Sequence, residues 1–134
     1  MELAELKETF DFFDDWEDKY RFIIDLGKEL TDIDDAEKIE ANLIRGCQSQ
    51  VWLTHRLLPD GRLEFFLDSD AFIVRGLISI VLSVYNERLP DDILAFDIEE
   101  FFSQLQLLQH LSPTRGNGLR AVIKRIRNIA HNHS

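Results

Sequence analysis

The sequence of 134 residues contains one cysteine, six glycines and three prolines. One thiol cannot form a disulfide within the chain, and it supplies too few ligands for a multi-thiolate zinc site or an iron–sulfur cluster. The scarcity of glycine and proline, with 45% hydrophobic and 30% charged residues, excludes a fibrous or low-complexity chain. We therefore expect one globular domain spanning residues 1–134.

The sequence also lacks a long apolar run and an overall excess of positive charge. Its longest apolar run, 76–85, is about half of the roughly 20 residues that a membrane-spanning helix needs. The first residues show neither the basic nor the apolar region of a secretory signal, so we expect a cytoplasmic protein that binds no membrane. The formal net charge of -10 argues against nucleic-acid binding, which normally requires a basic patch.

The charge is unevenly distributed along the chain. Residues 1–40 carry fifteen acidic and five basic side chains, whereas residues 41–134 carry ten of each. From position 115 onward the charged side chains are all basic, namely Arg115, Arg120, Lys124, Arg125 and Arg127. This end is first interpreted as a solvated helix face, although it could also meet an acidic partner.

Hydrophobic spacing indicates helices on both sides of a β-hairpin. Residues 51–58 and 63–67 have the bulky and β-branched composition of strands, and Pro59, Asp60 and Gly61 form a turn between them. Helical spacing is found in the segments 3–13, 15–30, 71–86, 97–111 and 119–130. The pattern predicts an α+β fold, in which helices pack on a small antiparallel sheet of about three strands. The apolar segment 71–86 is the expected core helix.

Cys47 is the main candidate for chemistry. A lone cysteine is more often a small buried hydrophobic residue than a reactive thiol. However, Cys47 lies in the polar stretch 46–50, between predicted elements, where the backbone is expected to be exposed. Gly46 permits unusual backbone angles, and Arg45 could lower the pKa of the thiol. Chemistry alone leaves the reactive and the buried interpretations equally supported.

A catalytic thiol would need a general base such as histidine. His55 or His110 could serve if the fold brought either of them to Cys47, which the sequence does not decide. This leaves a stand-alone thiol transferase or peroxidase as an alternative function. The sequence contains no G-x-S-x-G, P-loop or H-E-x-x-H motif, so conventional hydrolase, nucleotidase and zinc-protease functions have no support.

The segment Gly46-Cys47-Gln48-Ser49-Gln50-Val51-Trp52 resembles the sulfur-acceptor cysteine motif of the SufE family. Three further blocks resemble the same family in the same order: 16–28, 68–77 and 110–119. Together the blocks span nearly the whole chain. The spelling Gly-Cys-Gln-Ser-Gln is more similar to SufE than to its relative CsdE. At 114–118 the chain reads Thr-Arg-Gly-Asn-Gly instead of the commoner Ser-Arg-Ser-x-Gly, and the arginine is retained.

The resemblance implies an α+β fold similar to scaffold proteins of the IscU type, and a role in iron–sulfur cluster assembly. The chain would be a carrier and activator, not an enzyme itself. It would accept persulfide sulfur on Cys47 from a cysteine desulfurase, SufS, and pass it to the scaffold complex SufBCD. The pyridoxal phosphate belongs to the desulfurase, so no cofactor or metal is expected here. A homodimer is compatible with this role. An iron–sulfur scaffold function would rest on fold analogy alone.

The resemblance also assigns candidate site residues. The positions that match the family's motifs are Cys47, with Gly46, Gln48 and Ser49 beside it, and the more distant Asp70 and Arg115. We expect Arg115 to stabilise the thiolate or persulfide anion, and Asp70 to hold the cysteine loop and limit its exposure. The structural alternative is that Asp70 and Arg115 only stabilise helix ends.

Overall fold

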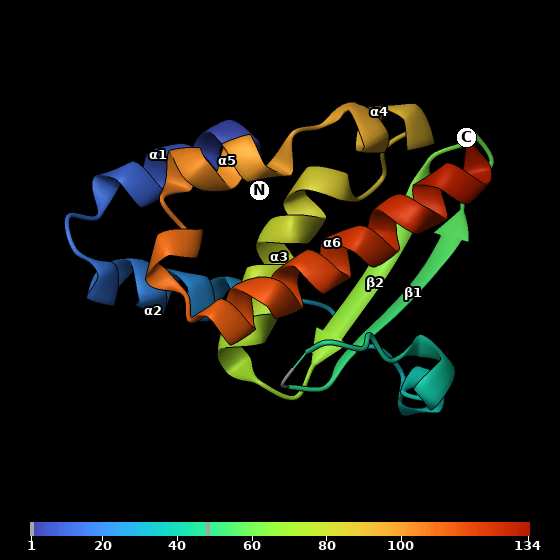
Figure 1. The fold of residues 1–134 in the computed structure, drawn as a ribbon, viewed down its shortest axis with the longest axis horizontal. Coiled ribbons are helices and arrows are strands. Elements are labelled where there is room, and N and C mark those ends of the chain that lie inside the picture. Colours follow the sequence, from blue (N-terminus) through green and yellow to red (C-terminus); the bar gives the residue numbers. More distant parts are fainter. Residues whose placement is uncertain (1, 48) are drawn as a thin grey trace.

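The computed structural model describes residues 2–47 and 49–134, which form helices packed around one β-hairpin (Figure 1). In chain order the main elements are α1 (Leu3–Phe12), α2 (Trp16–Lys28), β1 (Val51–Leu57), β2 (Leu63–Ser69), α3 (Phe72–Tyr85), α4 (Pro90–Ala95), α5 (Ile98–Leu105) and α6 (Pro113–His133). Three short 3₁₀ helices are η1 (Asp35–Glu37), η2 (Glu40–Asn42) and η3 (Leu108–His110). The predicted α+β class and the predicted hairpin are confirmed.

The sheet contains two strands in the described part of the chain, rather than the expected three. β1 and β2 pair antiparallel from Val51 opposite Ser69 to Leu57 opposite Leu63. Each edge gains only an isolated bridge, from Leu43 to Trp52 and from Leu63 to Arg88. Neither bridge extends into a third strand. The segment that contains Leu43 turns at Gly46. The segment that contains Arg88 leads into α4, whose first residue, Pro90, has no N–H to donate.

Helix α3 is the centre of the core, as its apolar sequence predicts. It contacts α2, β2 and α6, and eight of its fourteen residues are buried. Its closest neighbour is α2, where Gly27 and Gly76 face each other: a Cβ built on Gly76 would lie 2.0 Å from the carbonyl oxygen of Ile23. The two glycines therefore allow the helix backbones to touch.

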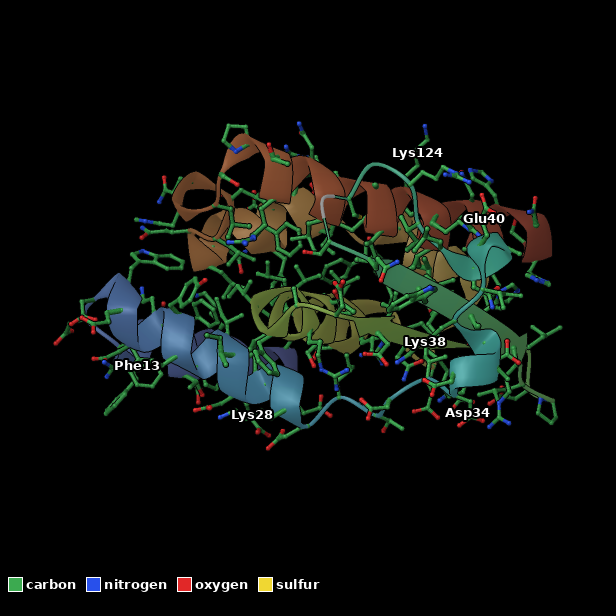
Figure 2. The ribbon with its side chains drawn as sticks, turned by 90° about the horizontal axis from the view of Figure 1, so that it is seen from below. Phe13, Lys28, Asp34, Lys38, Glu40 and Lys124 are labelled. Atoms are coloured by element: carbon green, nitrogen blue, oxygen red, sulfur yellow. The ribbon has the colours of Figure 1, made fainter. Side chains whose placement is uncertain are left out.

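A buried carboxylate joins the segment after α2 to the core. The side chain of Asp68, at the end of β2, is 2% exposed and forms an ion pair with Arg75 of α3. It also accepts the backbone N–H of Ile33 at 3.1 Å, and Lys38 lies 3.5 Å away. Figure 2 shows this segment, with Lys38 labelled, running alongside the hairpin. The carboxylate thus fixes the chain that leads to Cys47.

None of the helices in the described ranges combines the length and the apolar character that a membrane-spanning helix requires.

Candidate functional site

Cys47 lies in the loop that connects η2 to β1, beside the N-terminal turns of α3 and α6. Figure 1 shows how β1, α3 and α6 are arranged. The loop turns at Gly46, whose φ of +92° is in the left-handed region that favours glycine. This is the conformational role expected for Gly46. Gln48, another predicted site residue, lies outside the described residues.

The side chain of Cys47 lines a small, mostly apolar cavity of about 40 Å³. Its walls are apolar side chains from β1, α3 and α6: Val51, Val74, Leu77, Ile78, Leu119 and Val122. Ser49, Thr114 and Arg115 add polar groups. Cavities that bind small molecules are typically several hundred Å³, so this one suits a sulfur side chain and not a cofactor.

The thiol has a specific position within this cavity. It donates a hydrogen bond to the carbonyl oxygen of Gly118 in α6, with 3.4 Å between Sγ and oxygen. A Cβ built on Gly118 would lie 3.5 Å from Sγ and 3.6 Å from the Cα of Cys47. Gly118 therefore provides the acceptor, and a Cβ at its position would be in ordinary van der Waals contact with the cysteine. We call this position of the thiol, against Gly118, the thiol seat.

Burial raises the pKa of the Cys47 thiol, because the apolar walls disfavour the charged thiolate. This is opposite to the effect expected from Arg45, which instead pairs with Glu40 at 2.6 Å. Both side chains of that pair are largely exposed. In the thiol seat Cys47 is consequently a protonated and weakly nucleophilic group.

Asp70 is hydrogen-bonded to the chain that follows Cys47. Its Oδ1 accepts the backbone N–H of Gln50 at 3.1 Å, and its own N–H donates to the carbonyl of Gln50 at 3.4 Å. Ala71, rather than Asp70, is the N-cap of α3, and no side chain caps that helix in the described residues. These two hydrogen bonds fix the end of the cysteine loop to Asp70.

Arg115 reaches the cavity from the first turn of α6. Ser112 caps this helix by accepting the backbone N–H of Arg115 at 3.2 Å, so the helix start does not depend on the arginine side chain. Within residues 2–47 and 49–134 the guanidinium of Arg115 forms no ion pair. A positive charge therefore lies at the cavity without a fixed counter-charge.

Neither candidate histidine lines the cavity of Cys47. The ring of His110 stacks on Trp16, with 4.0 Å between the ring centroids. His55 lies in β1 with its ring 5.8 Å from that of His133. Among the described residues, neither candidate histidine is placed at the cavity of Cys47, where the thiol-enzyme alternative would need it.

Most of the basic side chains that follow Arg115 are bonded within the fold. Arg120 forms an ion pair with Glu99 at 3.0 Å, Arg125 donates to the carbonyl of Ala41, and Arg127 donates to two carbonyls of α4. Lys124 projects from α6, as Figure 2 shows. These bonds favour a structural role for this basic segment over a site for an acidic partner.

Sequence reasoning gave no role to Gly118, although it lies three residues after Arg115. Positions three apart share one face of a helix, so a helix bringing Arg115 to the cavity also brings Gly118. The contact with Cys47 joins residues 71 positions apart, and for that contact the sequence carries no signal.

Comparisons with known proteins identify the family and the fold. The family model described as "SufE: Fe-S metabolism associated domain" matches residues 4–130. An uncharacterized SufE-like protein from Rhizobium etli is 44% identical over 131 residues, which cover 96% of this chain and 88% of that protein. The solution structure of a hypothetical protein from Thermus thermophilus matches with a TM-score of 0.77, covering 98% of this chain and 94% of that one. The latter is 15% identical and shows the fold alone.

Proposed function

The chain belongs to the SufE family of Fe-S metabolism associated domains, and on this basis we propose that it accepts sulfur from a cysteine desulfurase of the SufS type. The observation that carries the proposal is the position of Cys47, the only cysteine of the chain. It lies on a loop, at a cavity too small for a cofactor and beside Arg115, which has no ion-pair partner in the part of the chain that the structure describes. These features suit a thiol that meets another protein.

The proposed step is an attack by the Cys47 thiolate on the outer sulfur of the desulfurase persulfide, Cys–S–SH. A new S–S bond forms at Cys47, the S–S bond on the desulfurase breaks, and its cysteine leaves as a thiolate. The outer sulfur carries its proton along, or releases it to solvent as the more acidic persulfide. The exchange is balanced and needs no added oxidant or reductant. Pyridoxal phosphate stays on the desulfurase, and this chain needs no cofactor.

The thiol seat and the reaction favour opposite protonation states of Cys47. The nucleophile is the thiolate, whereas burial in the seat favours the neutral thiol. We propose that docking of the desulfurase releases the loop that Asp70 holds at Gln50. Arg115 then offsets the negative charge of the thiolate or persulfide.

The rest of the chain suits a carrier and activator that is not itself an enzyme. A persulfide next to a second cysteine would be lost as an intramolecular disulfide, and this sequence has no second cysteine. The sulfur on Cys47 would be passed to a scaffold complex of the SufBCD type in the cytoplasm. The carrier thereby frees the desulfurase for another turnover.

The test is the release of sulfide from L-cysteine by a purified SufS-type desulfurase with a reductant. We expect strong stimulation by the wild-type protein and none by Cys47→Ser. Equal stimulation by both proteins would show that Cys47 is not the sulfur acceptor and that the protein acts as an allosteric activator. If neither stimulates, and the isolated protein consumes peroxide or exchanges glutathione, a thiol enzyme becomes the better description.

A further inference from the structure

Thr114 brings a hydroxyl group to the cavity of Cys47 from the first turn of α6. Within the described residues this hydroxyl takes part in no hydrogen bond. Thr9, in α1, instead donates its hydroxyl to the carbonyl oxygen of Glu5, one turn earlier, at 2.8 Å. Thr114 is the second residue of α6 and has no preceding turn of its helix to accept its hydroxyl. That hydroxyl is therefore available to the cavity.

Thr114 and Gly118 lie on the same face of α6, because residues four apart are one helical turn from each other. Both line the cavity of Cys47, as do Leu119 and Val122 further along the helix. Gly118 is buried, whereas Thr114 is exposed. The two positions are about 6 Å apart along the helix axis. This face of α6 therefore leads from the thiol seat inside the fold to a hydroxyl group at the surface.

The two ends of this face suit different protonation states of the sulfur. The carbonyl oxygen of Gly118 accepts a hydrogen bond from the thiol, but a carbonyl has no proton to donate to a thiolate. A hydroxyl group donates to an anion, and hydrogen bonds to charged groups are stronger than those between neutral groups. A sulfur that loses its proton therefore gains by moving from the carbonyl to the hydroxyl.

The other described walls of the cavity provide few alternatives to this hydroxyl. The lining side chains of β1 and α3 are apolar, namely Val51, Val74, Leu77 and Ile78. Ser49 lies on the cysteine loop itself, two residues from Cys47. Arg115 is the charged side chain among the described lining residues. Thr114 and Arg115 are thus the polar side chains that α6, and not the cysteine loop, holds at this cavity.

We propose that Thr114 donates a hydrogen bond to the sulfur of Cys47 when this sulfur is anionic, and so positions it one turn of α6 away from the thiol seat. The proton of Cys47 passes to solvent water, and Thr114 keeps its own proton. Arg115 offsets the negative charge, and Thr114 fixes where the sulfur lies. This inference rests on the proposed function and adds the residue that holds the nucleophile for the desulfurase.

The first test is the pH dependence of the alkylation of Cys47 by iodoacetamide in the isolated protein. Thr114→Val replaces the hydroxyl by a methyl group of similar size, and Thr114→Ser keeps the hydroxyl. We expect the rate profile of Thr114→Val to move to higher pH by about one unit, which is about a tenfold lower rate below the pKa of the thiol. The profile of Thr114→Ser should stay within about twofold of wild type.

Two controls show whether the shift belongs to the cavity of Cys47. Thr9→Val removes the hydroxyl of a threonine in α1 that does not line the cavity, and its rate should stay within about twofold of wild type. In urea, Thr114→Val should react at the same rate as the unfolded wild-type chain. The rates of all folded variants should converge at high pH, where each carries the thiolate.

A second test separates the position of the sulfur from the docking of the partner. A SufS-type desulfurase that carries its persulfide is mixed with increasing concentrations of this protein, and the rate of persulfide formation on Cys47 is measured in a single turnover. We expect Thr114→Val to lower the maximal rate about tenfold at neutral pH, with the half-saturating concentration unchanged. Thr114→Ser should recover the maximal rate.

Three outcomes would overturn the inference while leaving the proposed function intact. One is an alkylation profile of Thr114→Val that coincides with wild type. Another is a profile of Thr114→Ser that matches the valine variant, since the loss would then follow from shape and not from the hydroxyl. The third is a higher half-saturating concentration at an unchanged maximal rate, which would make Thr114 a docking residue. A wild-type protein that accepts no sulfur would refute the proposed function separately, because the alkylation profile needs no desulfurase.

Discussion

At the scale of single residues, the sulfur of Cys47 is held by a carbonyl oxygen rather than by a positive charge. The acceptor is Gly118, at 3.4 Å, and a carbonyl accepts a hydrogen bond from a thiol but repels a thiolate. Apolar walls act in the same direction by raising the pKa of Cys47. The resting protein therefore protects a neutral thiol.

The raised pKa predicts how the reactivity of Cys47 depends on pH. Alkylation by iodoacetamide follows the thiolate fraction, so the native protein should react more slowly than the urea-unfolded chain. Its rate should also rise at higher pH. The pKa of the Cys47 thiol is higher in the folded state than in the unfolded state. Its contribution to the free energy of unfolding is therefore present below the unfolded pKa and is lost as pH rises through the folded pKa. If the alkylation rate of the native protein rose at lower pH than that of the unfolded chain, the result would contradict this account.

A branched side chain at position 118 should expel the thiol from its seat. A Cβ at this position would be in ordinary contact with Sγ at 3.5 Å, so Gly118→Ala should leave alkylation of Cys47 within about twofold of wild type. The additional methyl groups of Gly118→Val have no such space. We expect the alkylation rate of the valine variant to rise severalfold. Equal rates for the two variants would show that the seat does not restrain Cys47.

At the scale of secondary-structure elements, the local periodicity predicted the helices and the hairpin. It did not predict the number of strands, because Leu43 and Arg88 make single bridges that depend on how distant segments meet the hairpin. Asp68 was also missed as a structural centre. Its partners Ile33 and Arg75 are 35 and 7 residues away, and only the fold brings them to one carboxylate.

The contact between α2 and α3 makes Gly76 the most sensitive glycine of the core. Gly76→Ala would place a Cβ 2.0 Å from the carbonyl oxygen of Ile23, so the helices must separate. We expect the free energy of unfolding in urea to fall by about 3 kcal/mol or more. The matched control is Gly116→Ala in α6, where the nearest atoms are 4.0 Å from the added Cβ. It should be neutral or stabilising by up to about 1 kcal/mol, and similar losses in both variants would refute the argument.

At the scale of the whole molecule, the fold places one thiol where the loop after η2 meets α3 and α6. The sequence motif identified Cys47, and the family resemblance identified Asp70 and Arg115, which the structure brings to the same loop or cavity. The thiol seat at Gly118 depends on the distance between the cysteine loop and α6, and no local pattern encodes it. Gln48 remains a prediction from the motif.

The acidic N-terminal third and the charge-balanced remainder also meet in the folded molecule. Two basic residues of the remainder pair with acids of the N-terminal third, namely Arg75 with Asp32 at 3.0 Å and Arg45 with Glu40 at 2.6 Å. Part of the charge asymmetry is therefore compensated by ion pairs between the two segments. The surface around Cys47, with Asp70 and Arg115, is the face that we propose for the desulfurase.

The most direct test of this account is the intact mass of the protein after incubation with a SufS-type desulfurase and L-cysteine in the absence of reductant. We predict a mass increase of about 32 Da per sulfur atom, mapped to Cys47, reversed by dithiothreitol and absent from Cys47→Ser. Stimulation of the desulfurase without this adduct, or an adduct that persists in Cys47→Ser, would contradict the proposal that Cys47 is the sulfur acceptor.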